Sequence, residues 1–328
     1  CLVLNIKPSG HAGRLFLLKG LLMQRYNKFS NFLKTKYGEK VWKICIDAGF
    51  TCPHKISNQI GCIFCRNDSF AGSTNPGLPV PLQVTRGIQL AKQKRDIRKF
   101  LIYFQTSTNT FAHVKKLKET FFSALCSKEI IGISISTRPD CLPDPVLDLI
   151  SELAQKVDVW IELGLQSRHD KTLELLNRGH SAQDYLEAVE KLLQLPVRIC
   201  THVMIGLPQE TNSDYIDTAK FVAATGTHEI KIHPLLVLKD TPLAELYFKD
   251  HFSMDREEYI EHVCNILEYL PKDMVIQRMT AEAPDEMLIA PRWALNKLAV
   301  LQGIENELER RGSFQGRCIK GSCFHICF

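Results

Sequence analysis

The sequence predicts an α/β protein whose parallel sheet closes into a partial barrel of six β/α units. Two observations support this fold class. From Lys99 onward, short apolar runs rich in β-branched residues alternate with amphipathic helical stretches, as in a parallel sheet covered by helices. Several expected strands also carry polar residues at alternate positions near their C-terminal ends, which favours a barrel with a polar interior over a sheet buried on both faces.

Each unit pairs one apolar strand with one helix. The helix after the third strand begins near Pro143, and Gly226 follows the helix after the fifth, as helix punctuation predicts. The expected strands are 40–49, 100–105, 130–137, 157–166, 197–208 and 229–238, and the expected helices between them are 81–96, 113–126, 143–156, 181–194 and 212–224.

Polar side chains recur along four of these strands. Side chains two positions apart share one face of a strand, and the C-terminal ends of barrel strands converge on the active site of such enzymes. Any one of these residues taken alone is better explained as a hydrogen-bonded core residue, but together they indicate a site. They are Ser134, Ser136, Glu162, Gln166, His202, Lys231 and His233.

The region after Asp240 leaves the strict alternation. We expect a helix at 255–269, a strand at 273–279 and a long final helix at 292–311, which together form an α+β extension packed on the barrel. Residues 1–22 are expected to be a leader outside the native fold, since the chain reads as a natural beginning at Met23. The cysteine-rich tail, 317–328, is expected to lie outside the fold as well.

Bulk properties set limits on the function. The net charge of +5 permits contact with RNA but is too small to predict a basic binding stripe. The most apolar early run, "LFLLKGLLM", contains a lysine and is about half as long as a membrane span requires, and no signal-peptide cleavage site follows it. We therefore expect a cytoplasmic protein without a membrane partner, whose twelve cysteines are not a disulfide framework.

Three cysteines stand out on the loop after the first strand. Cys52, Cys62 and Cys65 form a C-x9-C-x2-C pattern, and a C-x2-C pair directs two sulfur atoms to one metal centre. Cys45, inside the strand, is better explained as a core residue. The three thiolates allow either structural zinc, with His54 as the fourth ligand, or a [4Fe–4S] cluster with one open iron. Their position at the mouth of a barrel favours the open cluster.

The pattern resembles the radical SAM superfamily. Further stretches of sequence resemble the YhcC-like family within it, and this similarity runs from about Met23 to Gly316. That family is related to the radical SAM domain of the tRNA-modifying elongator catalytic subunit. These stretches are "AGFTCPHKI", "YFQTSTNTFA", "STRPDCLPD", "WIELGLQS", "LLNRGH", "THVMIGLPQET", "KIHPLLVLKDTPL" and "LIAPRWALNK". The resemblance implies a TIM-like radical SAM barrel at 23–239 with the C-terminal extension at 240–316.

The resemblance also implies two cofactors. Cys52, Cys62 and Cys65 would bind the [4Fe–4S] cluster, and S-adenosylmethionine would bind its open iron. Arg178 would contact the cofactor's carboxylate, since its two-pronged donor geometry suits that group. The usual glycine-glycine-glutamate element after the second strand is replaced by "FQTSTNT". The implied cofactor-binding residues are Phe64, Gln105, Thr106, Asn109, Ser136, Gln166 and Arg178.

The implied activity is reductive cleavage of S-adenosylmethionine to a 5′-deoxyadenosyl radical, which takes a hydrogen atom from a substrate. A one-electron reductant such as flavodoxin or ferredoxin would be needed, and tRNA is the candidate substrate. His202, Lys231, His233 and Glu162 are the candidate catalytic groups of the barrel interior. The alternative is a non-catalytic Cys3His zinc protein that binds RNA or another protein. Cys318, Cys323 and Cys327, with His325, could bind an auxiliary cluster, but the tail is better explained as appended sequence.

Overall fold

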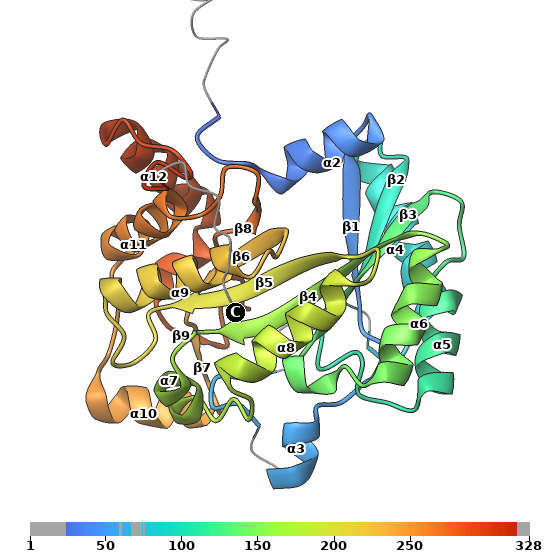
Figure 1. Cartoon of the computed structure of the whole chain (residues 1–328), viewed down its shortest axis with the longest axis horizontal. Coiled ribbons are helices and arrows are strands. Elements are labelled where there is room, and N and C mark those ends of the chain that lie inside the picture. Colours follow the sequence, from blue (N-terminus) through green and yellow to red (C-terminus); the bar gives the residue numbers. More distant parts are fainter. Residues whose placement is uncertain (1–23, 59–60, 67–73, 75, 320–328) are drawn as a thin grey trace, which may run out of the picture.

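The computed structural model describes residues 24–58, 61–66, 74 and 76–319. Among these residues, seven strands form one parallel sheet in the order β1-β2-β3-β4-β5-β6-β8, and two short strands, β7 and β9, pair separately as an antiparallel ribbon. Figure 1 shows the main sheet at the centre, with the helices around it. The α/β class and the parallel barrel sheet that the sequence predicts are confirmed.

The elements follow the chain in the expected alternation. Their bounds are α2 (Phe29–Tyr37), β1 (Val41–Ile46), α3 (Pro53–Asn58), α4 (Val80–Lys94), β2 (Lys99–Phe104), α5 (Val114–Ser123), β3 (Ile130–Thr137), η2 (Pro139–Cys141), α6 (Asp144–Ala154), β4 (Asp158–Gln166), α7 (Asp170–Leu175), α8 (Ala182–Leu193), β5 (Arg198–Ile205), α9 (Asn212–Ala224), β6 (Glu229–Pro234), β7 (Val237–Leu238), α10 (Pro242–Asp250), α11 (Arg256–Glu268), β8 (Val275–Arg278), β9 (Leu288–Ala290), η3 (Arg292–Leu295) and α12 (Lys297–Arg310).

The two faces of the sheet differ in chemistry. Apolar strand residues such as Ile133, Ile161 and Ile230 are buried in the main hydrophobic cluster with the apolar faces of the helices. Residues of the opposite parity, including Ser134 and Glu162, are also buried but polar. Because successive side chains of a strand point to opposite faces, the apolar set supplies the packing and the polar set lines the interior.

The strand expected at 273–279 is present as β8, and it extends the main sheet. β8 pairs in parallel with β6, which brings Lys231 beside Arg278. β1 and β8 are therefore the two edges of the open sheet. The segment before α2 runs along one of these edges, because Lys28 forms a parallel bridge with Ile276, whose N–H donates to the carbonyl of Asn27 at 2.8 Å.

Two expected elements differ from the structure. The strand predicted at 229–238 is interrupted: β6 ends at Pro234, which has no N–H to donate to a sheet, and β7 joins the antiparallel ribbon. The helix predicted at 292–311 is likewise two elements, η3 and α12. Asn296 separates them and caps α12, because its side chain accepts a hydrogen bond from the N–H of Ala299.

The expected leader, 1–22, lies outside the described residues, as do Cys323, His325 and Cys327 of the tail. Cys318 is described, and its backbone N–H donates to the carbonyl of Glu268 at 2.9 Å. The division at residue 240 remains a prediction. In the described part of the chain, no helix has the length and apolar character needed to cross a membrane.

Candidate active site

The three cysteines line one cavity of about 250 Å³. Cys52 precedes α3, and Cys62 and Cys65 follow it on the same loop after β1. The N–H of Cys65 donates to the carbonyl of Cys62 at 3.0 Å, so one turn carries both cysteines. This cavity also reaches polar residues of several strands, among them Glu162 and Lys231.

Backbone contacts to distant segments fix the cysteine loop. The side chain of Asn177 donates to the carbonyl of Gly61 at 2.6 Å. Ile63 donates its N–H to the carbonyl of Leu176 at 3.1 Å and accepts from the N–H of Leu243 at 3.0 Å. Phe64 lies with Ile63 against the hydrophobic cluster around α10, and it also lines the cavity. The loop is therefore held by the segment after α7 and by the start of α10.

The surroundings of the thiols are cationic. Nη1 of Arg178 lies 3.5 Å from Sγ of the buried Cys62. The pKa of Cys65 is raised to about 11, mainly by burial; Lys55 opposes this change, and the neighbouring Cys62 and Cys52 add to it. A thiol with this pKa must lose its proton when a metal binds, and nearby cations stabilise the thiolate that results.

Arg178 is held where the sequence predicts a cofactor contact. Its Nη2 donates to the carbonyl of Gly164 at 2.8 Å, and a Cβ atom on Gly164 would lie only 2.5 Å from the same nitrogen. A side chain at position 164 would displace the guanidinium of Arg178. Nε of Arg178 and Oε1 of Gln166 are both buried without a hydrogen-bond partner among the described residues. Gln166 ends β4 with a φ of 78°, a left-handed conformation that non-glycine residues rarely adopt.

These unpaired atoms provide a test of whether the site suits the implied cofactors. Buried polar groups in native proteins nearly always have partners. An N–H of Arg178 and a side-chain oxygen of Gln166, both beside the cavity that the three cysteines line, are a donor and an acceptor for a bound polar molecule. Three cysteine ligands for iron and such a pair fit an iron–sulfur cluster together with an amino acid-like cofactor.

The other four expected cofactor contacts divide into two pairs. Gln105 and Ser136 line the cavity. Thr106 and Asn109 are buried and are not among its lining residues. The side-chain amide of Asn109 instead donates to the carbonyls of Phe104, Thr106 and Ser136 at 3.1, 2.9 and 3.2 Å. Asn109 thus holds together the loop after β2 and the end of β3, and its contact with a cofactor remains a prediction.

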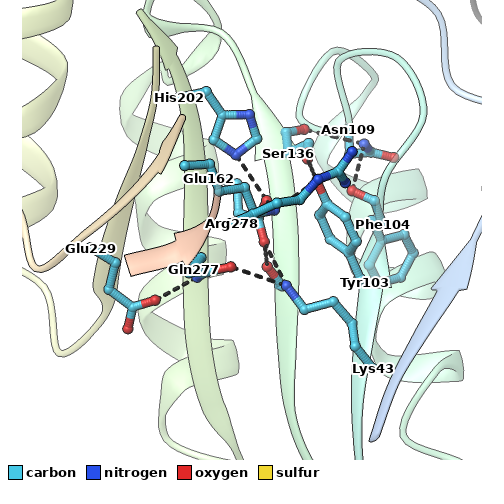
Figure 2. A network of polar contacts seen from close by, with 12 residues as sticks. Lys43, Tyr103, Phe104, Asn109, Ser136, Glu162, His202, Glu229, Gln277 and Arg278 are labelled. Carbon is cyan, nitrogen blue, oxygen red and sulfur yellow. Dashed lines mark hydrogen bonds and ion pairs between the residues drawn. The ribbon is translucent and has the colours of Figure 1, made fainter. Parts of the chain in front are cut away.

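Glu162 is the centre of the polar interior. Its carboxylate accepts hydrogen bonds from Ser134 at 2.6 Å, His202 at 2.9 Å and Lys43 at 3.2 Å, and it forms an ion pair with Lys231. Burial alone would raise the pKa of Glu162, but Lys231, Lys43 and His202 hold it well below its usual value. Figure 2 shows Glu162 between His202 and Lys43, with Gln277 linking Lys43 to Glu229.

Two of the expected catalytic groups titrate close to neutral pH or below it. Burial lowers the pKa of Lys231 to about 8, with Glu162 opposing this change and Lys43 adding to it. Burial and Lys231 together lower the pKa of His202 to about 4, so its imidazole is neutral at pH 7. Burial also lowers the pKa of His233, whose ring centroid lies 5.3 Å from that of His202. All four expected catalytic residues therefore line one cavity, as expected for side chains at barrel strand ends.

Sequence reasoning missed several residues of this cavity. Arg138 forms a two-pronged ion pair with Asp140 and donates to the carbonyl of Arg178 at 2.8 Å. Tyr103 accepts from Ser136 at 2.9 Å and from Lys231 at 3.3 Å. Two sequence features could have identified them as cavity residues. Arg138 comes directly after a predicted strand, and Tyr103 lies two positions before Gln105 on the same face of its strand.

His54 and the thiols do not come together as the alternative zinc site requires. His54 does not line the cavity of the cysteines, and its ring lies over Gly179, where a Cβ atom would be 2.8 Å from His54 Cε1. Within the described ranges, no three His, Cys, Asp or Glu side chains are grouped closely enough to hold a single ion. A cluster attaches each cysteine to a different iron atom, so it does not require three sulfur atoms to meet at one point.

Comparisons with known proteins agree with this geometry. Residues 49–222 match the model of the Radical SAM superfamily, and residues 227–310 match that of the Radical_SAM C-terminal domain. The chain is 40% identical to YtqA of Bacillus subtilis over 90% of this chain and 92% of that protein. It is 32% identical to YhcC of Escherichia coli over 89% and 94%.

Two further matches reach longer proteins. The tRNA uridine(34) acetyltransferase of Methanocaldococcus infernus is 24% identical over 66% of this chain but only 39% of its own length. The solved structure of Elp3 from the same organism shares the fold, with a TM-score of 0.66 and 19% identity, over 84% of this chain and 64% of that one. Together, the two family models and the two full-length relatives show that the chain belongs to the radical SAM superfamily of enzymes, in the group that contains YhcC and YtqA.

Proposed function

We propose that the protein binds a [4Fe–4S] cluster through Cys52, Cys62 and Cys65 and binds S-adenosylmethionine beside it, and that it cleaves this cofactor reductively. The observation that carries the proposal is the cavity in which the three cysteines and Arg178 lie together, with Nε of Arg178 unpaired. When bound, the cluster and S-adenosylmethionine supply a 5′-deoxyadenosyl radical that abstracts a hydrogen atom from the substrate.

The chain's own residues bind and orient the cofactor. Arg178 offers its guanidinium to the carboxylate of the methionine moiety, held in place by the carbonyl of Gly164. Gln166 offers an unpaired side-chain oxygen to an amino or hydroxyl group. Phe64 provides an apolar surface for the adenine. Gln105 and Ser136 supply further polar contacts from the ends of β2 and β3.

The interior network handles protons on the substrate side. Lys231 has a pKa of about 8 and can give or accept a proton near neutral pH, while Glu162 stays ionised and fixes the lysine's position. His202 is neutral at pH 7 and contacts the same carboxylate. These groups would position the reacting carbon–hydrogen bond in the cavity that the cysteines also line.

The substrate that we propose is tRNA, and the electron donor is a flavodoxin- or ferredoxin-like protein. The tRNA assignment rests on the names of the more distant relatives and on the mild positive charge of the chain. The thiol-rich site suits a reducing compartment such as the cytoplasm.

The first experiment is anaerobic reconstitution with iron and sulfide, followed by addition of dithionite and S-adenosylmethionine. We expect reductant-dependent 5′-deoxyadenosine and stoichiometric cluster iron from the wild type. Cys62→Ala should abolish both, whereas Cys126→Ala, which changes an exposed cysteine outside the cavity, should change neither. A colourless protein that holds one zinc and does not cleave the cofactor would overturn the proposal.

Addition of unfractionated tRNA tests the substrate. Turnover of S-adenosylmethionine should rise when tRNA from a strain lacking the gene is added, and a nucleoside of that tRNA should change mass. Unchanged nucleosides, together with active cofactor cleavage, would exclude tRNA while leaving the radical chemistry intact.

A further inference from the structure

A second, larger cavity of about 920 Å³ adjoins the one lined by the cysteines. It lies between the two edge strands, because its lining includes Lys43 and Cys45 of β1 and Gln277 and Arg278 of β8. Tyr103, Gln105, Lys231, Arg278 and Glu282 line both cavities. The two cavities therefore meet at these residues, and the open edge of the sheet leads inward toward the cysteines.

The meeting point carries more positive than negative charge. Glu162 forms ion pairs with Lys43 and Lys231, and Arg278 lines the same region. Glu282 also lines both cavities, but its carboxylate is ion-paired to Lys297. Cations in a cavity lose hydration, and this is tolerated when a counter-charge compensates them. Arg278 contributes to the lowered pKa of Glu282, so Lys43, Lys231 and Arg278 face two carboxylates, Glu162 and Glu282, and still outnumber them.

Arg278 is the cation with donors to spare. Its Nε donates to the carbonyl of Thr280 at 2.6 Å, which fixes the plane of the guanidinium. Among the described residues, no carboxylate lies within ion-pair distance of Arg278, and its two terminal nitrogens make no hydrogen bond. In Figure 2, the side chain of Arg278 extends from its strand toward Tyr103, and dashed lines join Glu162 to His202 and Lys43.

Strand pairing places a second cation beside these donors. Lys231 of β6 is the register partner of Arg278 of β8, and both side chains line both cavities. A planar guanidinium with two free nitrogens binds the two oxygens of a carboxylate or phosphate in parallel, and an adjacent ammonium adds a point charge.

On the basis of the proposed function, we propose that the substrate carries a carboxylate or phosphate group, and that Arg278, assisted by Lys231, binds this group where the two cavities meet. The larger cavity leaves room for the rest of the substrate to extend out between β1 and β8. The anionic group would thereby be bound at the β8 edge of the sheet, whereas the cysteine loop follows β1 at the other edge. The reacting part of the substrate would lie between Arg278 and the cysteines.

Calorimetric titration of the reconstituted full-length protein tests this inference. Inorganic phosphate and succinate are the probes, and saturating S-adenosylmethionine occupies the site near Arg178. We expect one anion per chain, with affinity weakened roughly tenfold or more in Arg278→Gln and less in Arg278→Lys. Arg256→Gln, which changes an exposed arginine of α11, is the matched control and should bind as the wild type does. The preferred probe distinguishes a carboxylate from a phosphate.

Equal affinities in the wild type and Arg278→Gln, or no binding into the millimolar range, would overturn the inference. So would binding that is lost only in Arg178→Gln, because the anion would then occupy the cofactor's place. Thermal unfolding of each variant establishes that it is folded. Binding of S-adenosylmethionine is measured in a separate titration, so failure of the proposed function is distinguishable from failure of the anion site.

Discussion

Replacement of Glu162 by glutamine should destabilise the protein more than any exposed charge replacement. Among the described residues, Glu162 is the only carboxylate that contacts both Lys43 and Lys231, and Lys231 is almost fully buried. Removal of one partner of a buried ion pair costs about 3–5 kcal/mol, because the remaining charge is left uncompensated. We expect a decrease of this size in the free energy of unfolding near pH 6. Lys43 is partly exposed and contributes less to it than Lys231 does.

The pH dependence identifies the cause. The pKa of Lys231 is lowered to about 8 in the folded wild type, and it should fall further without Glu162. Between these two pKa values the folded wild type holds one proton more than the folded variant. The stability difference should therefore shrink by about 1.4 kcal/mol per pH unit as pH rises from the variant's lower Lys231 pKa to about 8. Above about pH 8, Lys231 is neutral in both folded proteins, and about 1–2 kcal/mol from lost hydrogen bonds should remain.

Urea denaturation of wild type and variant at several pH values, monitored by circular dichroism, measures this difference. Glu152→Gln is the control, because Glu152 pairs with Lys118 at 2.7 Å on the surface and should cost about 0–1 kcal/mol at every pH. A loss below about 1 kcal/mol for Glu162→Gln, or a loss independent of pH, would refute the assignment of two uncompensated cations.

Three further substitutions or conditions test other parts of the structure. Asn109→Ala should lower the free energy of unfolding by about 2–3 kcal/mol, because the carbonyls that its amide serves lose their donor; a loss near zero in urea denaturation would contradict this. Gly179→Ala should reduce the amount of iron bound after reconstitution, because the φ of Gly179 is 72° and a Cβ atom there would collide with His54. Bound iron equal to that of the wild type would contradict this packing. The free energy of unfolding should fall as pH decreases from about 6.5 to about 4. Burial lowers the pKa of folded His202 to about 4, so only the unfolded chain takes up the proton in that range. A free energy of unfolding that stays constant in urea denaturation between these pH values would exclude this contribution.

Much of the fold could be predicted because its signals are local. The runs that became β2 to β5 are apolar, β-branched and bounded by turns, and their ends agree with the prediction to within a few residues. The breaks at Pro234 and Asn296 were missed, although both are local as well: a proline ends the ladder, and an asparagine caps the next helix. The membership of β8 in the main sheet depends on pairing between distant segments, which no local pattern encodes.

The site was predictable where one residue type suffices for the chemistry. Cysteine spacing identified Cys52, Cys62 and Cys65, and strand alternation identified Glu162 and Lys231 as interior groups. Tyr103 and Arg278 were missed because tyrosine in a strand usually packs, and because Arg278 gains its position only through pairing with β6. Asn109 was predicted as a cofactor contact because its side chain is polar and near the site, but its amide donates to backbone carbonyls and does not line the cavity.

Different interactions hold the residues at the two ends of the cavity. At the cysteine end, the loop is fixed by backbone hydrogen bonds to Leu176 and Leu243, so its geometry depends on the packing of α7 and α10. At the inner end, the geometry depends on ion pairs around Glu162, which the sheet itself positions. Because the two sets share no hydrogen bond, substitutions at Glu162 or Arg278 should leave iron binding intact, whereas loss of Cys62 should leave anion binding intact. This separation allows cluster assembly and substrate recognition to be measured independently in one protein.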